Sequence, residues 1–299
     1  MGSKRVGIVD LGSNTFHLLV CDVEEGKFAE VHRRRQFVAL AEGGIEIIKD
    51  SAIERATAAL QQIAADIAAH EVKNIKIVGT AALRSATNAK VIHTIVKELL
   101  QQSIEVIAGS REAELIYKGI SLLPGTQTGS HLIMDIGGGS TEFIVVSDGQ
   151  LLWSQSFNIG VGVLHELFHK QEPMAGSDIR RMNAYLTEVL LPLKIELGQH
   201  PVDTIIGASG SFEVLASMQR LPLHTDQLMV FDQSVFSNLE QDVVQSDYEA
   251  RAQLPGMPST RVKLIVVAFV LLRHIIDLAK VDTISISPYA IKEGLLSEM

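Results

Sequence analysis

Short apolar runs alternate with longer amphipathic stretches along the chain. Runs with alternating polarity predict strands, and apolar residues at spacings of three and four, as in the alanine-rich stretch 52–70, predict helices. Strands that alternate with helices are typical of an α/β fold. The pattern predicts strands at 6–10, 15–23, 27–32, 75–79, 104–108, 131–136, 142–146, 151–157, 204–207 and 283–287. It predicts helices at 52–70, 88–101, 111–122, 178–197, 212–218, 234–245, 261–278 and 290–297, and tight turns at 12–14 and 25–26.

One sequence pattern occurs twice. Val9–Thr15 and Met134–Thr141 each contain an apolar strand end, an aspartate, an apolar residue, a glycine turn and hydroxyl residues. The aspartates, Asp10 and Asp135, stand 135 − 10 = 125 residues apart, which is the length of a domain. We interpret the chain as a duplicated unit of three strands followed by helices. The expected domains are 1–125 and 126–299, with a cleft between them and the last helix packed back onto the first domain.

The glycine turns predict a binding site for phosphate. Backbone N–H groups approach an anion closely where glycine carries no side chain, and nearby hydroxyl groups add donors. A third glycine-rich turn, at 207–211, precedes a helix whose N-terminus also favours anions. An aspartate beside bound phosphate would be repelled unless a cation bridges the two groups. The pattern therefore also predicts Mg²⁺ or another divalent cation.

Charge and composition exclude several classes of protein. Lys and Arg number 26 against 35 Asp and Glu, a formal net charge of −9, which argues against a nucleic-acid coat or a membrane-surface binder. The longest apolar run, 264–272, is shorter than the ~20 residues that a bilayer requires. The one cysteine, Cys21, cannot form an internal disulfide, which fits a reducing compartment. We expect a cytoplasmic protein with no nucleic-acid or membrane partner.

Six segments carry a resemblance to a known family. They are 10–17, 79–84, 109–114, 135–142, 207–211 and 292–294, and the most specific are Gly-Thr-x-x-Leu-Arg at 79–84 and Asp-Ile-Gly-Gly-Gly-Ser-Thr-Glu at 135–142. In this order they resemble the exopolyphosphatase / guanosine pentaphosphate phosphatase family of the actin-like ATPase superfamily. The resemblance implies two actin-like (ribonuclease H-like) α/β domains with an interdomain cleft. It also implies hydrolysis of a terminal phosphoanhydride.

The resemblance also implies roles for single residues. Glu112 matches the catalytic base, which takes a proton from water, and Arg84 matches an arginine that grips phosphoryl oxygens. Asp135 and Glu142 match an acidic pair linked to the divalent cation, and Asp10, the aspartate of the first turn, is a third candidate ligand. The expected phosphate contacts are Ser13, Asn14, Gly138, Gly139, Ser140, Thr141, Ser209 and Ser211.

The chain departs from the family at positions where many members carry an arginine. Phe37 and Ala39 stand near the end of the third strand, and the segment 160–164 also lacks one. A long polyanion needs counter-charge, so we expect the chain to bind it more weakly unless other cations replace these arginines. The candidate replacements are Arg33, Arg34, Arg35, Lys263 and Lys292.

Three functions remain open at this stage. The preferred one is a hydrolase that releases terminal phosphate from inorganic polyphosphate. The alternatives are a guanosine pentaphosphate 5′-phosphohydrolase and a polyphosphate- or nucleotide-binding module without turnover. A homodimer is compatible with the sequence.

A rival motif occurs at His165–His169, which satisfies the H-E-x-x-H pattern of zinc enzymes. A third zinc ligand with a supporting motif is not recognisable, so we favour a packing role. In that interpretation Leu164, Leu167 and Phe168 point inward, and both histidines lie on the surface.

Longer relatives in the family continue into an additional helical domain that is associated with processive polyphosphate handling. We therefore expect this chain to prefer short substrates. Initial rates on polyphosphates of defined length test the expectation. The fastest turnover is expected on short chains, and the fastest turnover on very long chains would refute it.

Overall fold

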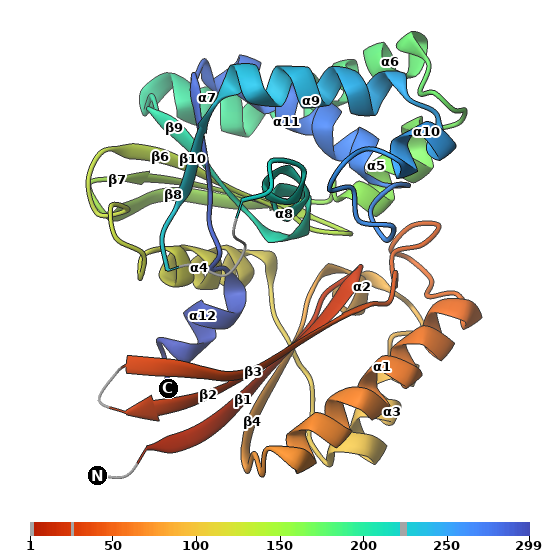
Figure 1. Ribbon diagram of the computed structural model, residues 1–299, viewed down its shortest axis with the longest axis vertical. Helices are drawn as coiled ribbons and strands as arrows, with labels where there is room; N and C mark the ends of the chain where they lie inside the picture. Colours follow the sequence, from red (N-terminus) through yellow and green to blue (C-terminus); the bar gives the residue numbers. More distant parts are fainter. Residues whose placement is uncertain (1–2, 25–26, 222–225) are drawn as a thin grey trace.

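Two β-sheets, each with helices on its outer face, are stacked with a pair of helices between them (Figure 1). The computed structural model describes residues 3–24, 27–221 and 226–299, and the predicted turn at 25–26 lies outside them. Strands and helices follow one another along the chain as the apolar pattern predicted.

The first sheet has five strands in the order β3-β2-β1-β4-β5. Its strands are β1 (Lys4–Leu11), β2 (Thr15–Glu24), β3 (Lys27–Phe37), β4 (Asn74–Gly79) and β5 (Glu105–Val106). The first three form an antiparallel meander, and β4 and β5 continue parallel to β1 on its other side. The helices of this half are α1 (Asp50–Ala69), α2 (Ala81–Ser85) and α3 (Lys90–Leu100). The apolar stripe of α1 packs on β1 and β2, which buries one face of the sheet.

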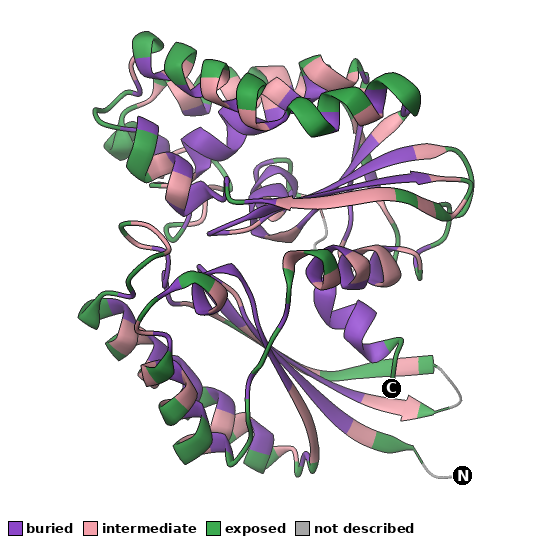
Figure 2. Ribbon diagram, turned by 180° about the vertical axis from the view of Figure 1, so that it is seen from behind, coloured by how far each residue is buried: buried purple, intermediate pink, exposed green. Residues whose placement is uncertain are grey.

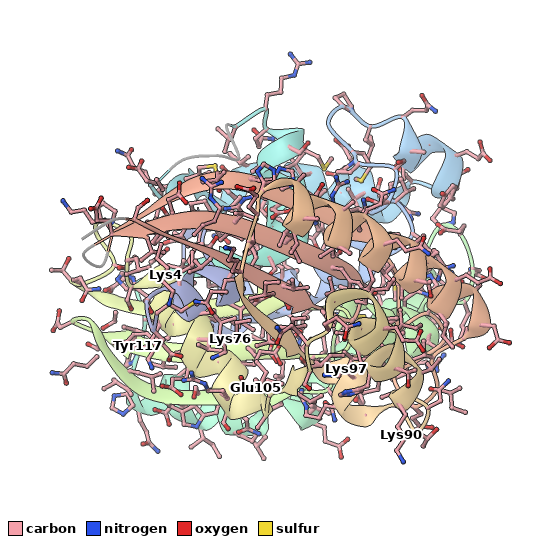
Figure 3. All side chains as sticks on the ribbon, turned by 90° about the horizontal axis from the view of Figure 1, so that it is seen from below. Lys4, Lys76, Lys90, Lys97, Glu105 and Tyr117 are labelled. Atoms are coloured by element: carbon pink, nitrogen blue, oxygen red, sulfur yellow. The ribbon has the colours of Figure 1, made fainter. Side chains whose placement is uncertain are left out.

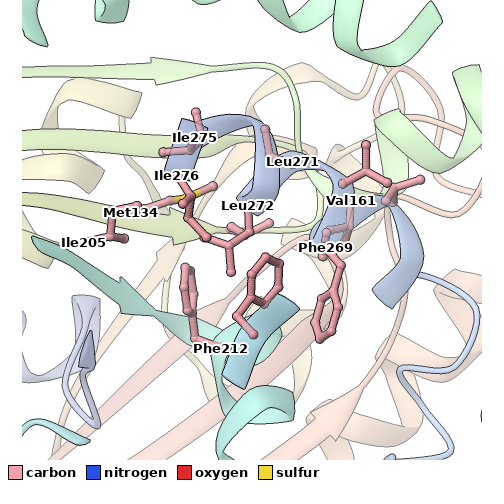
Figure 4. Packing of buried hydrophobic residues seen from close by; sticks show 14 of the residues in the cluster. Met134, Val161, Ile205, Phe212, Phe269, Leu271, Leu272, Ile275 and Ile276 are labelled. Carbon is pink, nitrogen blue, oxygen red and sulfur yellow. The ribbon is translucent and has the colours of Figure 1, made fainter. Parts of the chain in front are cut away.

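The second sheet has six strands in the order β10-β11-β9-β6-β7-β8. Its strands are β6 (Ser130–Ile136), β7 (Thr141–Ser147), β8 (Gln150–Phe157), β9 (Thr204–Ala208), β10 (Met229–Asp232) and β11 (Thr283–Ile286). The helices that follow them are α5 (Val161–Phe168), α6 (Gly176–Val189), α7 (Leu191–Gln199), α8 (Ser209–Met218), α9 (Gln233–Gln245), α10 (Tyr248–Ala252) and α11 (Ile265–Ala279). Because α11 is apolar on nearly all sides, it lies in the core, where Phe269, Leu272 and Ile276 gather near Phe212 and Met134 (Figure 4).

The duplication predicted from the sequence is confirmed by the topology. β6, β7 and β8 repeat the meander of β1, β2 and β3, and β9 runs parallel to β6 as β4 runs parallel to β1. The predicted fold class, α/β with two domains of one topology, is therefore correct. The exact domain boundary near residue 125 stays a prediction.

Two helices fill the space between the sheets: α4 (Gly109–Ile120) and α12 (Ile291–Leu296). Their buried side chains join one apolar cluster with strands of both sheets, and α12 packs on α4 and on β1. Figure 2 shows α12 almost wholly buried. Tyr117 of α4 also donates a hydrogen bond to the carbonyl of Gly149 in the β7–β8 turn at 2.6 Å (Figure 3). This pair of helices connects the two halves.

Several elements differ from the sequence predictions. The helix expected at 178–197 is two helices that meet at Leu190, because Pro192 in the first turn of α7 has no N–H to continue α6. The short strand β10 and the short helices α2 and α10 were not predicted, since fewer than six residues give no clear periodicity. The last strand of the first sheet is only Glu105–Val106.

The helices of the chain carry charged side chains at the surface. Lys90 and Lys97 of α3 are exposed (Figure 3). Within the described ranges, no helix combines the length and the apolar character that crossing a bilayer requires.

The crossing of α4 and α12 depends on two glycines. A Cβ atom on Gly294 would lie 1.9 Å from the carbonyl oxygen of Leu115, and one on Gly119 would lie 2.1 Å from that of Ala290. We predict that Gly294→Ala lowers the free energy of unfolding by about 1–3 kcal/mol through overpacking, measured by denaturant titration. Gly198→Ala is the control, because nothing lies within 4 Å of its Cβ position. Equal effects of the two substitutions would contradict the prediction.

Candidate functional site

The two glycine turns have the same local geometry. The N–H of Gly12 donates to the carbonyl of Thr15 at 3.2 Å, and the N–H of Gly137 donates to the carbonyl of Ser140 at 3.0 Å. Each turn joins the first two strands of its sheet. The repeated sequence pattern therefore corresponds to a repeated turn.

The turns lie face to face between the two halves. A Cβ atom on Gly138 would lie 2.6 Å from Cγ of Asn14, and one on Gly139 would lie 3.0 Å from Oγ of Ser13. Because a methyl group at Gly138 would collide with Asn14, the close approach of the turns requires glycine there. The Ser13 hydroxyl in turn accepts a hydrogen bond from the N–H of Ala82 at 3.0 Å.

A cavity of about 80 Å³ adjoins both turns. The predicted site residues that line it are Asp10, Ser13, Asn14, Glu112, Asp135, Gly138, Gly139, Ser140, Glu142 and Ser209. These residues come from both sheets and from α4, so the fold collects them from distant parts of the chain.

Strand register places the acidic residues next to each other. Asp135 of β6 stands directly opposite Glu142 of β7, and Asp10 of β1 stands directly opposite His17 of β2. Directly opposed residues share one face of an antiparallel pair. His17 is thus the counterpart of Glu142 in the first half.

Burial raises the pKa of the carboxyl groups in this cavity. Desolvation is the largest cause in each case and raises the pKa of Asp10 and Asp135 to about 6. The pKa of Glu142 rises to about 7 through burial and the charge of Asp135. The pKa of Glu112 lies well above its usual value because of burial and the charge of Glu142. A cation among these groups would favour their ionised forms.

Hydrogen bonds hold Glu142 in place. The hydroxyls of Ser140 and Ser156 each donate to Oε1 of Glu142 at 2.7 Å. Ser156 stands opposite Glu142 in the β7–β8 register. One carboxylate oxygen therefore has two donors, and the side chain is fixed toward the cavity.

Glu112 lies beside an arginine. It occupies the first turn of α4, and Nη1 of Arg84 lies 3.3 Å from its Oε2. The same nitrogen donates to the carbonyl of Ile107 at 2.8 Å, which fixes the guanidinium group. Arg84 does not itself line the cavity, but it contacts Glu112, which does.

The third turn contributes a residue in an unusual conformation. Ser209 has a φ of 67°, in the left-handed region that serine rarely adopts. Its side chain lowers the pKa of the Asp135 carboxyl group, which burial raises. The strained residue thus places a hydroxyl at the cavity.

Two predicted phosphate contacts do not line the cavity. The hydroxyl of Thr141 donates to the carbonyl of Ile159 at 3.1 Å and is therefore already paired within the protein. Ser211 is buried in the first turns of α8. Their role as phosphate contacts stays a prediction from the sequence.

The oxygen ligands present suit a divalent cation. Mg²⁺ prefers oxygen ligands and commonly takes one or two carboxylates, completed by water and substrate phosphate. Oδ1 of Asp10 is buried and has no hydrogen-bond partner in the described part of the chain. Among the residues that the structure describes, no three His, Cys, Asp or Glu side chains form a complete metal site. Asp10, Asp135 and Glu142 line one cavity but are not arranged as a three-ligand metal site, so a cation there would need water or substrate to complete its coordination.

Some cavity residues were not predicted. His17, Thr80 and Arg261 also line the cavity. His17 could have been found from its position opposite Asp10, which repeats the Glu142–Asp135 pair. Arg261 gave no sequence signal, because it stands before the apolar helix α11 and reaches the cavity only in the folded chain. Burial and the charge of Arg35 lower its pKa to about 10.

The H-E-x-x-H segment does not form a zinc site of the usual kind. Helix α5 ends at Phe168, so His169 lies beyond it, and the two imidazole rings touch edge to face with their centroids 5.0 Å apart. The nearby carboxylate of Glu172 pairs with the buried guanidinium of Arg251. The expected surface arrangement is wrong in two respects: His169 is buried, and Leu167 is 43% exposed.

The chain is similar to a family of phosphatases over most of its length. Residues 19–299 match the Ppx/GppA phosphatase family. A guanosine-5′-triphosphate,3′-diphosphate pyrophosphatase of Vibrio parahaemolyticus is 29% identical over 99% of this chain. The match covers 59% of that relative, so the chain spans about three fifths of its length.

Solved structures share the fold. The crystal structure of an exopolyphosphatase from Cytophaga hutchinsonii superposes with a TM-score of 0.93 at 34% identity and covers 98% of this chain and 96% of that one. The crystal structure of the Ppx/GppA protein of Aquifex aeolicus superposes with a TM-score of 0.79 at 24% identity and covers 99% of this chain and 97% of that one.

The position of His165 generates a prediction about zinc. Its ring lines a different cavity, and burial lowers its pKa to about 4. We predict that protein purified without chelators carries no stoichiometric zinc by plasma mass spectrometry, and that His165→Ala leaves the metal content unchanged. One zinc per chain that disappears in this variant would restore the zinc-enzyme interpretation.

Proposed function

Because the chain belongs to the Ppx/GppA phosphatase family, as its motifs indicated, we propose that it hydrolyses phosphoanhydrides and releases terminal phosphate from inorganic polyphosphate. The observation that carries the proposal is the buried cavity between the glycine turns. Oδ1 of Asp10 and Nδ2 of Asn14 are both buried there without a hydrogen-bond partner in the described residues. Buried polar atoms are normally paired. A phosphoryl group bound with a cation supplies a partner to each.

Glu112 acts as the general base in this proposal. The oxygen of a water molecule attacks the terminal phosphorus, and the water proton passes to the carboxylate of Glu112. The bond from that phosphorus to the bridging oxygen breaks, and the shortened chain leaves with the electron pair. The raised pKa of Glu112 makes its carboxylate a stronger base than an exposed one.

The surrounding groups position the phosphoryl group and offset its charge. Arg84 holds Glu112 and adds positive charge beside the reacting phosphorus. The proposed phosphate contacts are Ser13, Asn14, Gly138, Gly139, Ser140 and Ser209, which line the cavity, and Thr141 and Ser211, which do not. Positioning and charge stabilisation supply most of the catalysis in phosphoryl transfer.

A divalent cation, Mg²⁺ in our proposal, fits among the carboxylates of Asp10, Asp135 and Glu142. When bound, it neutralises phosphoryl oxygens and orients the substrate. The hydroxyls of Ser140 and Ser156 keep Glu142 aimed at this position.

Guanosine pentaphosphate is the second candidate substrate. The Vibrio relative bears a name that refers to this nucleotide, but the chain spans only 59% of its length. The exopolyphosphatase of Cytophaga hutchinsonii matches nearly the full length of both chains, which favours inorganic polyphosphate. Action in the cytoplasm and a homodimeric state remain predictions from the sequence.

We predict that Glu112→Gln lowers phosphate release with Mg²⁺ about a hundredfold or more, because loss of a general base removes that much rate. The assay compares inorganic pentaphosphate, long polyphosphate and guanosine pentaphosphate. Glu114→Gln is the matched control, because Glu114 lies on the same helix but pairs with Lys118 and Arg111 at the surface. It is expected to keep its rate within about twofold, since exposed ion pairs contribute little.

Wild-type protein that releases no phosphate from any of the three substrates would contradict the enzyme assignment and favour the binding module. If the Glu112 and Glu114 variants lose phosphate release to the same extent, Glu112 is not the general base.

A further inference from the structure

Ser156 of β8 contacts two parts of the site at once. Its hydroxyl donates to Oε1 of Glu142 at 2.7 Å. It also lies against Gly109, the first residue of α4: a Cβ atom on this glycine would lie 2.4 Å from Cβ of Ser156 and 2.7 Å from its Oγ. One side chain therefore lies between the carboxylate of Glu142 and the start of the helix that carries Glu112.

Pairing within the second sheet determines where Ser156 lies. Asp135 of β6 stands opposite Glu142 of β7, which stands opposite Ser156 of β8. Directly opposed residues share one face of a sheet, so the three side chains form a row across three strands. β8 is the outer strand of this sheet, and α4 packs along it. The row thus ends at the catalytic helix of the proposed reaction.

The close contact with Ser156 requires glycine at position 109. Real Cβ atoms essentially never approach another heavy atom within 3.0 Å, and a methyl group here would lie at 2.4 Å. The backbone itself would accept alanine, because the φ of Gly109 lies outside the left-handed region. Alanine also has the higher helix propensity. Packing against Ser156, and not local conformation, therefore explains the glycine at the start of α4.

Arg84 holds the same end of α4 from a second direction. Its Nη1 donates to the carbonyl of Ile107 at 2.8 Å and lies 3.3 Å from Oε2 of Glu112. Its Nη2 lies 3.7 Å from the Cβ position of Gly109. The first turn of α4, which carries Glu112, is therefore confined between Arg84 and Ser156.

The two carboxylates that Ser156 connects depend on their separation. After burial, the charge of Glu142 is the largest cause that raises the pKa of Glu112, so the two groups lie close together. Phosphoryl transfer depends mainly on positioning, and a misplacement of about 1 Å costs up to about a hundredfold in rate. A small displacement of the first turn of α4 therefore has a large expected effect.

We propose that Ser156 is a positioning residue that sets the separation of Glu112 and Glu142. Its hydroxyl holds Glu142, and its Cβ fixes the start of α4 through the contact with Gly109. The inference rests on the proposed function, in which Glu112 is the general base. Ser156 does not line the cavity, so it acts through these neighbours and not on the substrate.

A cycle of variants at the contact tests the proposal by phosphate release from inorganic pentaphosphate with Mg²⁺. Gly109→Ala is expected to lower kcat about thirtyfold with KM within about threefold, because its methyl group displaces the first turn of α4. Ser156→Gly is expected to lower kcat about tenfold, because Glu142 loses one of its two serine donors.

The double variant Gly109→Ala/Ser156→Gly is the decisive member of the cycle. It is expected to be no slower than Ser156→Gly alone, because the collision is removed and Nη2 of Arg84, at 3.7 Å, is the next neighbour of the new methyl group. Independent effects would instead multiply to about three hundredfold.

Ser154→Ala is the matched control on the strand. Ser154 stands opposite Ile144, one pair away from Ser156 on the same face of β8. This variant is expected to keep kcat and KM within about twofold. Ser156→Ala keeps the Cβ contact with Gly109 and removes only the hydroxyl, so it is expected to lower kcat as much as Ser156→Gly does.

The proposal is overturned if the double variant shows the product of the single effects, or if Ser154→Ala and Ser156→Ala lower kcat equally. If Gly109→Ala does not fold, recovery of the folded state in the double variant supports the contact, and no recovery overturns it. Melting temperatures of all variants distinguish loss of folded protein from loss of kcat.

Crystal structures of the variants give a readout that does not depend on activity. The separation of the Glu112 and Glu142 carboxylates is expected to change in Gly109→Ala and to return in the double variant. An unchanged separation in Gly109→Ala overturns the proposal. If the wild type releases no phosphate, the proposed function fails, and these structures alone decide whether Ser156 sets the separation.

Discussion

Repulsion among four buried carboxylates is the constraint on which the rest of the site depends. Asp10, Glu112, Asp135 and Glu142 line one cavity, and burial raises the pKa of each. Side-chain donors from serines and the guanidinium of Arg84 offset only part of that cost. A ligand that arrives with a cation would offset the remaining negative charge of the cavity. A neutral ligand would leave the repulsion in place.

The backbone of the two glycine turns determines how closely the turns approach each other. The two turns can face each other only because Gly138 and Gly139 carry no side chains against Asn14 and Ser13. The same turns expose main-chain groups that suit an anion. A side chain at Gly138 or Gly139 would therefore force the facing side chains to shift.

The duplicated turns could be predicted from sequence because each is a local device. An aspartate at a strand end followed by glycine predicts the same strand and turn wherever it occurs. Two copies separated by the length of a domain therefore indicate two equivalent halves. The roles of Glu112 and Arg84 came from resemblance alone, and the structure adds that they lie side by side. Lys292 was a candidate counter-charge from the sequence, and it lines an adjoining cavity. The cavity position of Arg261 could not be predicted, because it depends on how the last third of the chain folds back over the first.

The H-E-x-x-H segment shows the opposite case, in which a strong local pattern is overruled by tertiary structure. Its first histidine lies in α5, but the helix ends before the second. The Glu172 carboxylate near His169, at 3.3 Å, also pairs with Arg251, which lies far along the chain. Pattern reasoning placed Leu167 inward because helical spacing favoured it. Its exposure follows from the shortness of α5, which presents only part of its surface to the core.

The crossing of α4 and α12 has a consequence for how the molecule opens. α4 and α12 touch through Gly119 and Gly294, and their buried side chains join strands of both sheets in one cluster. The glycine turns, in contrast, belong to the two sheets. A relative movement of the two halves would therefore have to repack the contact between these helices.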